Sequence, residues 1–274
     1  MSDRDFSDVR RLVVKVGTNV LAREGRVDVD FVGRICDQLA QVREAGREVL
    51  VVSSGAIGMG AVELGVEHKL SSIQTRQACA AVGQPLLMEA YREAFRARGI
   101  QVAQVLVTRE VFENRTSYVN LRSAVEELLE IGVVPIFNEN DSVSTEEIGS
   151  AFGDNDRLSA FVASKVDAEL LCLLTDIDAL YDRDPRQDAQ AKPLRHVVEI
   201  TEEIVASAGS PGSRLATGGM RTKIEAAKIA RRGGCRVVLA HGREESVIPR
   251  ILAGEELGTL FYALVDQPLD LVEL

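Results

Sequence analysis

Residues 169–175 read ELLCLLT, a run in which every inner position is apolar. A short run without alternation of polar and apolar residues indicates a strand that is buried on both faces. Five further short runs predict strands: 11–16 (RLVVKV), 48–53 (EVLVVS), 101–107 (QVAQVLV), 133–138 (VVPIFN) and 236–240 (RVVLA). Strands with two buried faces are typical of parallel sheets that are covered by helices.

Helical patterns fill the stretches between these strands. In 30–45 the residues Phe31, Ile35 and Leu39 recur at helical spacing, and Gly46 supplies a stop signal. The same reasoning predicts helices at 85–98, 119–131, 157–166 and 220–232, a glycine-rich turn at 55–60, and an irregular stretch at 176–218. Strands that alternate with helices predict an α/β fold, namely a doubly wound, mostly parallel sheet flanked by helices on both faces.

The composition excludes several classes of protein. The 274 residues carry a net charge of −10, which argues against nucleic acid as a partner. No apolar run approaches the roughly 20 residues of a membrane span, and the first residues lack the apolar region of a secretory signal. The cysteines form no C-x-x-C pair, so we expect reduced thiols in a cytoplasmic protein. There are four of them: Cys36, Cys79, Cys172 and Cys235.

Polar motifs stand at the ends of the predicted strands, where ligands of doubly wound sheets bind. Lys15 lies in an otherwise apolar run just before Gly17, so it either extends to water or meets an anion. Ser54-Gly55-Ala56 follows the strand at 48–53. Backbone N–H groups at a helix start bind anions, although a tight connection explains the same glycine equally well.

Two further segments suggest charged ligands. Residues 139–156 hold six carboxylates and no lysine or arginine, and their Asp and Asn residues suit an ammonium group or Mg²⁺. Residues 217–223 (TGGMRTK) open a helix with two glycines and place Lys223 in its first turns. The Gly-Lys pair of the Walker motif is absent, so a phosphate-binding loop and a surface lysine both remain open.

Six motifs together resemble the amino acid kinase family, and within it the members that act on glutamate. They occur in order over about residues 10–265: VVKVGTNV, VVSSGAIGMG, FNEND, FGDND, LLTD with LYDRDPR, and ATGGMRTK. The pair FNEND and FGDND is the part that resembles the glutamate-phosphorylating members specifically. It also favours an amino acid with a free ammonium group as the substrate.

The resemblance implies ATP-dependent phosphorylation of the γ-carboxylate of L-glutamate to L-glutamyl 5-phosphate, the first step of proline biosynthesis. It implies a single domain over 1–274, with an amino-acid-binding lobe at about 1–167 and a nucleotide-binding lobe at about 168–274. ATP and Mg²⁺ are the implied cofactors. Many members carry a C-terminal PUA domain, and we expect none in a chain that ends at Leu274.

By the same resemblance, Lys15 and Lys223 are catalytic residues that contact the ATP phosphates, and Asp156 positions the two lysines. The implied glutamate ligands are Ser54, Gly55, Ala56, Asp141 and Asn155. The implied nucleotide ligands are Lys15, Thr175, Asp176, Thr217, Gly218, Gly219, Met220, Arg221, Thr222 and Lys223. Mg²⁺ would arrive with ATP, and Asp154 or Asp156 could serve as a further ligand.

The implied chemistry needs no general base. A glutamate side chain has a reference pKa of about 4.3, so the nucleophile is already an anion near neutral pH. The task is therefore to bring a carboxylate to a triphosphate against their repulsion, which calls for positioning and positive charge. This suits motifs that contain lysines and no histidine.

The resemblance also implies proline as a feedback inhibitor, functional coupling to glutamyl phosphate reductase, and assembly into a homo-oligomer. Two other functions remain open. One is a sister kinase acting on aspartate, acetylglutamate, carbamate or a nucleotide, and the other is a regulator that binds an amino acid without turnover. A dinucleotide oxidoreductase is disfavoured, because no G-x-G-x-x-G follows the first strand.

Overall fold

The computed structural model describes residues 4–23, 26–143, 155–207 and 219–264. The chain forms two compact units, of which unit 1 comprises Met1–Lys15 with Asp156–Leu274 and unit 2 comprises Val16–Asn155. This division differs from the expected lobes, which met near residue 167. The N-terminal strand belongs with the C-terminal half because its backbone is tied there. Arg11 N donates to Glu169 Oε2 at 2.7 Å, and Glu169 N donates to Arg11 O at 3.2 Å.

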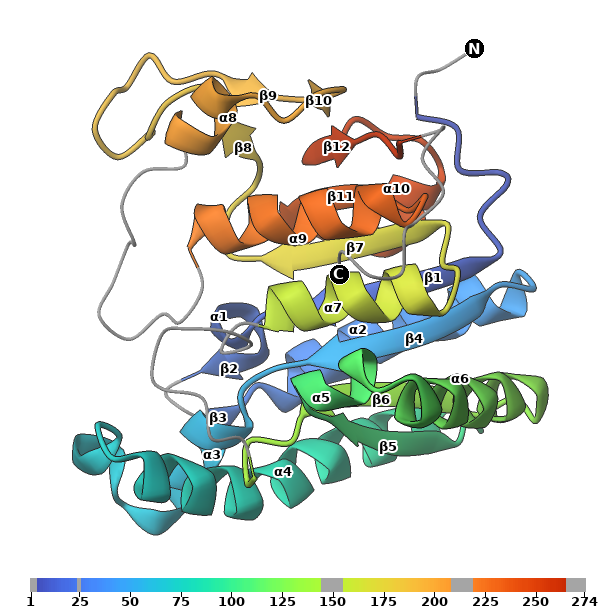
Figure 1. The fold of residues 1–274 in the computed structure, drawn as a ribbon, viewed down its shortest axis with the longest axis vertical. Helices are drawn as coiled ribbons and strands as arrows, with labels where there is room; N and C mark the ends of the chain where they lie inside the picture. Colours follow the sequence, from blue (N-terminus) through green and yellow to red (C-terminus); the bar gives the residue numbers. More distant parts are fainter. Residues whose placement is uncertain (1–3, 24–25, 144–154, 208–218, 265–274) are drawn as a thin grey trace. The chain divides into compact units, whose positions relative to one another are not determined.

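Unit 2 is built on three parallel strands in the order β4 (Glu48–Ser53), β6 (Val134–Glu139), β5 (Val102–Val107). Its other elements are α1 (Thr18–Leu21), the hairpin of β2 (Ala22–Arg23) and β3 (Arg26–Val27), α2 (Val29–Glu44), α3 (Ala56–Leu64), the 3-10 helix η1 (Glu67–Lys69), α4 (Ile73–Arg96), α5 (Arg109–Glu113) and α6 (Arg115–Glu130). Helices α2, α4 and α6 contact the strands of this unit (Figure 1).

Unit 1 contains the strand order β10-β12-β11-β7-β1. Its elements are β1 (Arg11–Val16), α7 (Asn155–Lys165), β7 (Leu170–Thr175), β8 (Leu180–Tyr181), β9 (Pro193–Leu194), β10 (His196–Val197), α8 (Glu202–Ser207), α9 (Met220–Arg232), β11 (Arg236–His241), α10 (Val247–Leu252) and β12 (Thr259–Phe261). Strand β11 runs parallel to β7 and antiparallel to β12. Helices α9 and α10 pack on β11 (Figure 1). The α/β class with a mostly parallel sheet flanked by helices is therefore confirmed.

Local signals in the sequence explain where the main helices form. Asp28 caps α2, since its Oδ1 accepts from Phe31 N at 3.0 Å, and Phe31, Ile35 and Leu39 are all buried as expected. The strand core is equally clear, because every residue of β7 is buried. The helix predicted at 220–232 coincides with α9.

Two predictions in unit 2 were incomplete. The glycines expected in a turn at 55–60 extend into α3, and the helix expected from residue 85 begins at Ile73, so that Pro85 lies inside α4. The glycines serve helix packing. A Cβ at Gly60 would overlap the carbonyl oxygen of Cys79, and one at Gly83 would overlap that of Ala56. Side chains at these two positions would force α3 and α4 apart.

Polar residues occupy the carboxyl ends of the strands in each unit. Lys15 is the penultimate residue of β1, and Thr175 ends β7, both in unit 1. In unit 2, Ser53 ends β4 and Asn138 is the penultimate residue of β6. Among the described residues, no helix is both long and apolar enough to cross a membrane.

Candidate functional site

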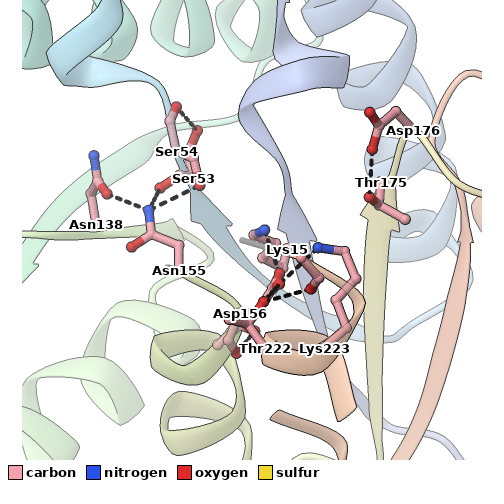
Figure 2. A network of polar contacts seen from close by, with 12 residues as sticks. Lys15, Ser53, Ser54, Asn138, Asn155, Asp156, Thr175, Asp176, Thr222 and Lys223 are labelled. Carbon is pink, nitrogen blue, oxygen red and sulfur yellow. Dashed lines mark hydrogen bonds and ion pairs between the residues drawn. The ribbon is translucent and has the colours of Figure 1, made fainter. Parts of the chain in front are cut away.

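Unit 1 holds a buried group of two lysines, one aspartate and one threonine, which we call the lysine–aspartate cluster (Figure 2). Asp156 is its centre. One oxygen of that carboxylate, Oδ1, accepts from Lys15 Nζ, and the other, Oδ2, lies 2.9 Å from Lys223 Nζ. Thr222 Oγ1 lies 3.0 Å from Asp156 Oδ2 and 2.8 Å from Gly219 O, so its single hydroxyl hydrogen has two acceptors within reach.

The three charged side chains of this cluster are almost fully withdrawn from water. Their relative exposures are 5% for Lys15, 7% for Lys223 and 0% for Asp156. Buried charges are costly unless they are paired, and here one carboxylate serves two ammonium groups. The formal charge of the trio is +1, so the cluster is suited to a further anion.

Helix α9 adds backbone donors to the same cluster. It begins at Met220, and its N-cap is Gly219, which has no side chain to accept from the first N–H groups. The first N–H groups of a helix lack intrahelical partners and favour anions. Because Thr222 and Lys223 lie in the first turns, this helix start combines backbone donors, a hydroxyl and an ammonium group. Such a combination suits phosphate oxygens.

Thr175 and Asp176 also belong to unit 1. Thr175 Oγ1 lies 3.0 Å from Asp176 Oδ1, directly after β7 (Figure 2). Thr175 is buried, whereas Asp176 is exposed. Their contact is a local polar turn, and it includes none of the lysine–aspartate cluster.

Unit 2 holds a second group, which we call the amide cluster and define as Gln84, Gln104, Asn138, Asn155 and Ser54. Asn155 Nδ2 lies 2.7 Å from Asn138 Oδ1 and 3.1 Å from Ser54 Oγ, and it also donates to the carbonyl of Ser53 (Figure 2). Asn138 Nδ2 in turn donates to Gln84 Oε1 at 2.8 Å. The cluster is therefore a chain of neutral polar side chains at the ends of β4 and β6.

The expected glutamate ligands Ser54, Gly55 and Ala56 join β4 to α3. Gly55 is the N-cap of α3 and has a φ of 101°, a left-handed conformation that favours glycine. It offers no side chain to the first N–H groups of α3. This helix start therefore presents backbone donors beside Ser54, as a carboxylate ligand requires.

Asp141 follows β6 in unit 2, and its environment is unfavourable for a negative charge. Desolvation by burial raises the pKa of its carboxyl from 3.8 to about 6, and Arg76 opposes this rise only partly. A carboxylate held in this way is stabilised when a cation binds beside it. Asp141 is therefore chemically suited to an ammonium ligand.

Three predicted site residues lie outside the described residues: Asp154, Thr217 and Gly218. Met220 and Arg221 are the first two residues of α9, where Arg221 is exposed. Within the described ranges, no group of three or more His, Cys, Asp or Glu side chains is arranged to hold a metal ion. All four cysteines are buried and free.

The comparison with known families is decisive. A model of the amino acid kinase family matches residues 10–241. The chain belongs to the amino acid kinase family. Among solved structures, this amino acid kinase is similar in fold to UMP kinase from Bacillus anthracis, with a TM-score of 0.64 and 17% identity over 93% of this chain and 96% of that one. An isopentenyl phosphate kinase gives a TM-score of 0.63 at 18% identity, over 92% and 99% of the two chains.

Closer relatives are curated glutamate 5-kinases. The protein of that name from Methanosarcina mazei is 49% identical over 96% of this chain and 71% of its own length. The one from Pelobacter propionicus is 46% identical over 94% of this amino acid kinase and 69% of its own length.

Sequence reasoning missed Gln84 of the amide cluster and the neighbouring Tyr91. Gln84 lies in α4 and reaches Asn138, and Tyr91, two turns further on, lies 3.1 Å from Ser53 Oγ through its hydroxyl. Both are buried. The available signal was the polar Gln84 directly after Gly83 in an otherwise small and apolar stretch, ACAAVGQ, of this amino acid kinase.

Proposed function

We propose that this chain catalyses the glutamate 5-kinase reaction, in which ATP phosphorylates the γ-carboxylate of L-glutamate to give L-glutamyl 5-phosphate and ADP. The observation that carries this function is the 49% identity to a curated glutamate 5-kinase over 96% of the chain. The chain is thus a kinase of proline biosynthesis. The residue roles that follow are our proposals.

The step itself is a displacement at phosphorus. A γ-carboxylate oxygen of glutamate forms a bond to the γ-phosphorus of ATP, and the bond from that phosphorus to the β–γ bridging oxygen breaks. ADP leaves with the electron pair. Since the nucleophile is ionised near neutral pH, no protein group has to remove a proton. Catalysis then rests on positioning and on stabilising the charge of the transferred group.

The lysine–aspartate cluster supplies that positive charge. We assign Lys15 and Lys223 to the phosphate oxygens, together with the N–H groups at the start of α9. Each lysine is a compact point charge, which suits a group that moves between two oxygens. Asp156 is the positioning residue: it offsets the repulsion between the ammonium groups and directs both, one to each carboxylate oxygen.

The substrate amino acid is assigned to groups of unit 2. Asp141 would pair with the α-ammonium, because burial disfavours its ionised carboxylate and a cation bound beside it would stabilise that form. Asn155 would add a further polar contact to the amino acid, and the backbone at Ser54, Gly55 and Ala56 would hold the remaining polar groups. The last amide-cluster residue, Asn155, and the centre of the lysine–aspartate cluster, Asp156, are consecutive in the sequence.

The residues present are better suited to Mg²⁺ that arrives bound to ATP than to Mg²⁺ held by protein ligands alone. Both oxygens of Asp156 accept from lysines, and the described residues contain no acidic group of three. Mg²⁺ prefers to keep waters and to bind phosphate oxygens with one or two carboxylates. When bound, it would neutralise part of the triphosphate charge.

Four further assignments follow from this function. Proline keeps the amine and carboxylate of glutamate, so we propose that it competes at the same groups. Glutamyl phosphate is a reactive acyl phosphate, which favours coupling to a glutamyl phosphate reductase. We also propose a homo-oligomer and a cytoplasmic location, the latter because all four cysteines are free thiols.

Trapping with hydroxylamine tests the function, because it converts an acyl phosphate into a hydroxamate and phosphate. We expect hydroxamate and ADP in equal amounts with ATP, Mg²⁺ and L-glutamate, and neither with L-aspartate or N-acetyl-L-glutamate. Turnover of another acceptor would indicate a sister kinase. Binding of glutamate without ADP or hydroxamate would indicate a regulator, and would contradict the proposal.

A further inference from the structure

The hydrogen bonds of the amide cluster all run in one direction, away from Asn155. Asn155 Nδ2 donates to Asn138 Oδ1 at 2.7 Å, Asn138 Nδ2 donates to Gln84 Oε1 at 2.8 Å, and Gln84 Nε2 donates to Gln104 Oε1 at 3.0 Å. A primary amide has a donor side and an acceptor side. In a series of hydrogen-bonded amides, the orientation of each amide therefore depends on that of its neighbour.

Two backbone groups fix the direction of this series of hydrogen bonds. The N–H of Glu139 can only donate, and it lies 2.9 Å from the Asn138 side chain, which must therefore present Oδ1 there. The carbonyl of Ser53 can only accept, so the Asn155 atom that faces it must be Nδ2. The reverse orientation of either asparagine would place two donors or two acceptors against each other.

The consequence for Asn155 is that its other amide atom, Oδ1, points out of the cluster. None of the described residues donates a hydrogen bond to it. A carbonyl oxygen in this position is an acceptor, and it is suited to a substrate group that carries N–H hydrogens. The α-ammonium of an amino acid is such a group, whereas a carboxylate would be repelled.

Gln84 completes the arrangement from outside the substrate contacts. Asn138 is 2% exposed and Gln84 is 8% exposed, so the Asn138 amide nitrogen has little access to water and needs the Gln84 oxygen as its acceptor. Gln84 is itself held in place, because α4 lies against α3 through Gly60 and Gly83, and because Gln104 accepts from its nitrogen.

We propose that Gln84 is a positioning residue that keeps the Asn138 and Asn155 amides in one orientation, and thereby presents Asn155 Oδ1 to the α-ammonium of the substrate. This inference rests on the proposed function. It makes Gln84, a residue outside the proposed substrate and nucleotide contacts, responsible for selecting substrates with a free α-amine.

Two substitutions separate positioning from stability. Gln84→Met has a similar length but offers Asn138 no oxygen, so we expect the KM for L-glutamate to rise about tenfold, the usual effect of one lost neutral hydrogen bond, while kcat and the KM for ATP change less than twofold. Gln84→Glu keeps the acceptor. Its glutamate KM should stay within about threefold of the unsubstituted value, although burying a carboxylate should lower Tm.

Glutarate, which is glutamate without the α-ammonium, is the decisive probe. Its inhibition constant against L-glutamate should be the same for the unsubstituted chain and for Gln84→Met. Gln84→Met and Asn155→Ala should also be non-additive in the glutamate KM, since both act on one contact.

An unchanged glutamate KM in Gln84→Met would overturn the inference. So would equal KM changes in Gln84→Met and Gln84→Glu, or an equal loss of glutarate binding, because a merely structural role predicts those results. Failure of the underlying function would look different: the unsubstituted chain would then form no hydroxamate from L-glutamate at all.

Discussion

One carboxylate oxygen of Asp156, Oδ2, lies 2.9 Å from the ammonium group of Lys223, and the other, Oδ1, accepts a hydrogen bond from Lys15. One fully buried aspartate therefore orients two lysines that are distant in the sequence. This relationship makes Asp156 a sensitive position of the proposed phosphoryl-transfer site.

Asp156→Asn is expected to lower kcat by about 10²-fold or more while raising the glutamate KM far less. The amide has one acceptor oxygen, so it directs at most one lysine, and the two ammonium groups then repel each other. Steady-state kinetics with both substrates varied would check the split. An unchanged kcat would remove Asp156 from the mechanism, and a Tm measurement shows whether the variant is folded.

Lys15→Ala and Lys223→Ala should each reduce kcat by about 10²-fold or more, as expected for the loss of one charge-stabilising donor. Lys228→Ala is the matched control. Lys228 lies in the same helix as Lys223 and pairs with Glu225 at 3.1 Å, but it is partly exposed and outside the cluster. If either substitution in the cluster lowered kcat no more than the control does, the lysine concerned would not take part in phosphoryl transfer.

Asp141→Asn should stabilise the fold and impair the enzyme. Burial raises the pKa of Asp141 from 3.8 to about 6 in the folded chain, so the cost of ionising this carboxyl is complete above about pH 6 and disappears as the pH falls toward 3.8. The free energy of unfolding should rise by about 3 kcal/mol at pH 8 and by less at pH 5.

The same variant should mainly raise the KM for L-glutamate, since the proposed partner of the α-ammonium is lost. Glu130→Gln, at the exposed end of α6, controls for the removal of a charge. Denaturant unfolding at the two pH values checks the stability, and kinetics check the KM. A change confined to the KM for ATP would show that the amino acid and nucleotide were assigned to the wrong residues.

Gly60→Ala tests the close approach of α3 and α4. The added methyl would overlap the Cys79 carbonyl, so we expect a loss of about 1–3 kcal/mol or more in the free energy of unfolding. Gly58→Ala, in the same helix, meets nothing within 4 Å and should be neutral or stabilising by up to about 1 kcal/mol. Equal effects of the two substitutions would mean that the helices do not need this contact.

The strands and most helices were predictable because their signals are local. The apolar run at β7 and the Asp28 cap of α2 depend on residues that are neighbours in the sequence. The start of α4 was missed because Pro85 has a strong preference for the first turn of a helix, and tertiary packing overrides that preference here. Strand β12 was missed because it has only three residues.

The types of residue at the site were predictable from the sequence, but the contacts between their side chains were not. Strand-end motifs and the family resemblance named Lys15, Asp156 and Lys223, yet only the structure reveals that each carboxylate oxygen serves a different lysine. The role of Gln84 could not be inferred, because its contact with Asn138 depends on the register of α4 against β6. Such registers are properties of tertiary packing.

The central claim is that a glutamate oxygen attacks the γ-phosphorus of ATP, and isotope transfer tests it most directly. L-Glutamate labelled with ¹⁸O in both γ-carboxylate oxygens is incubated with the chain, ATP, Mg²⁺ and hydroxylamine. Hydroxylamine breaks the carbon–oxygen bond of the acyl phosphate, so each phosphate released should carry one ¹⁸O, detected by mass spectrometry. Unlabelled phosphate, produced at the same rate as ADP, would contradict the account, because water rather than glutamate would then be the acceptor.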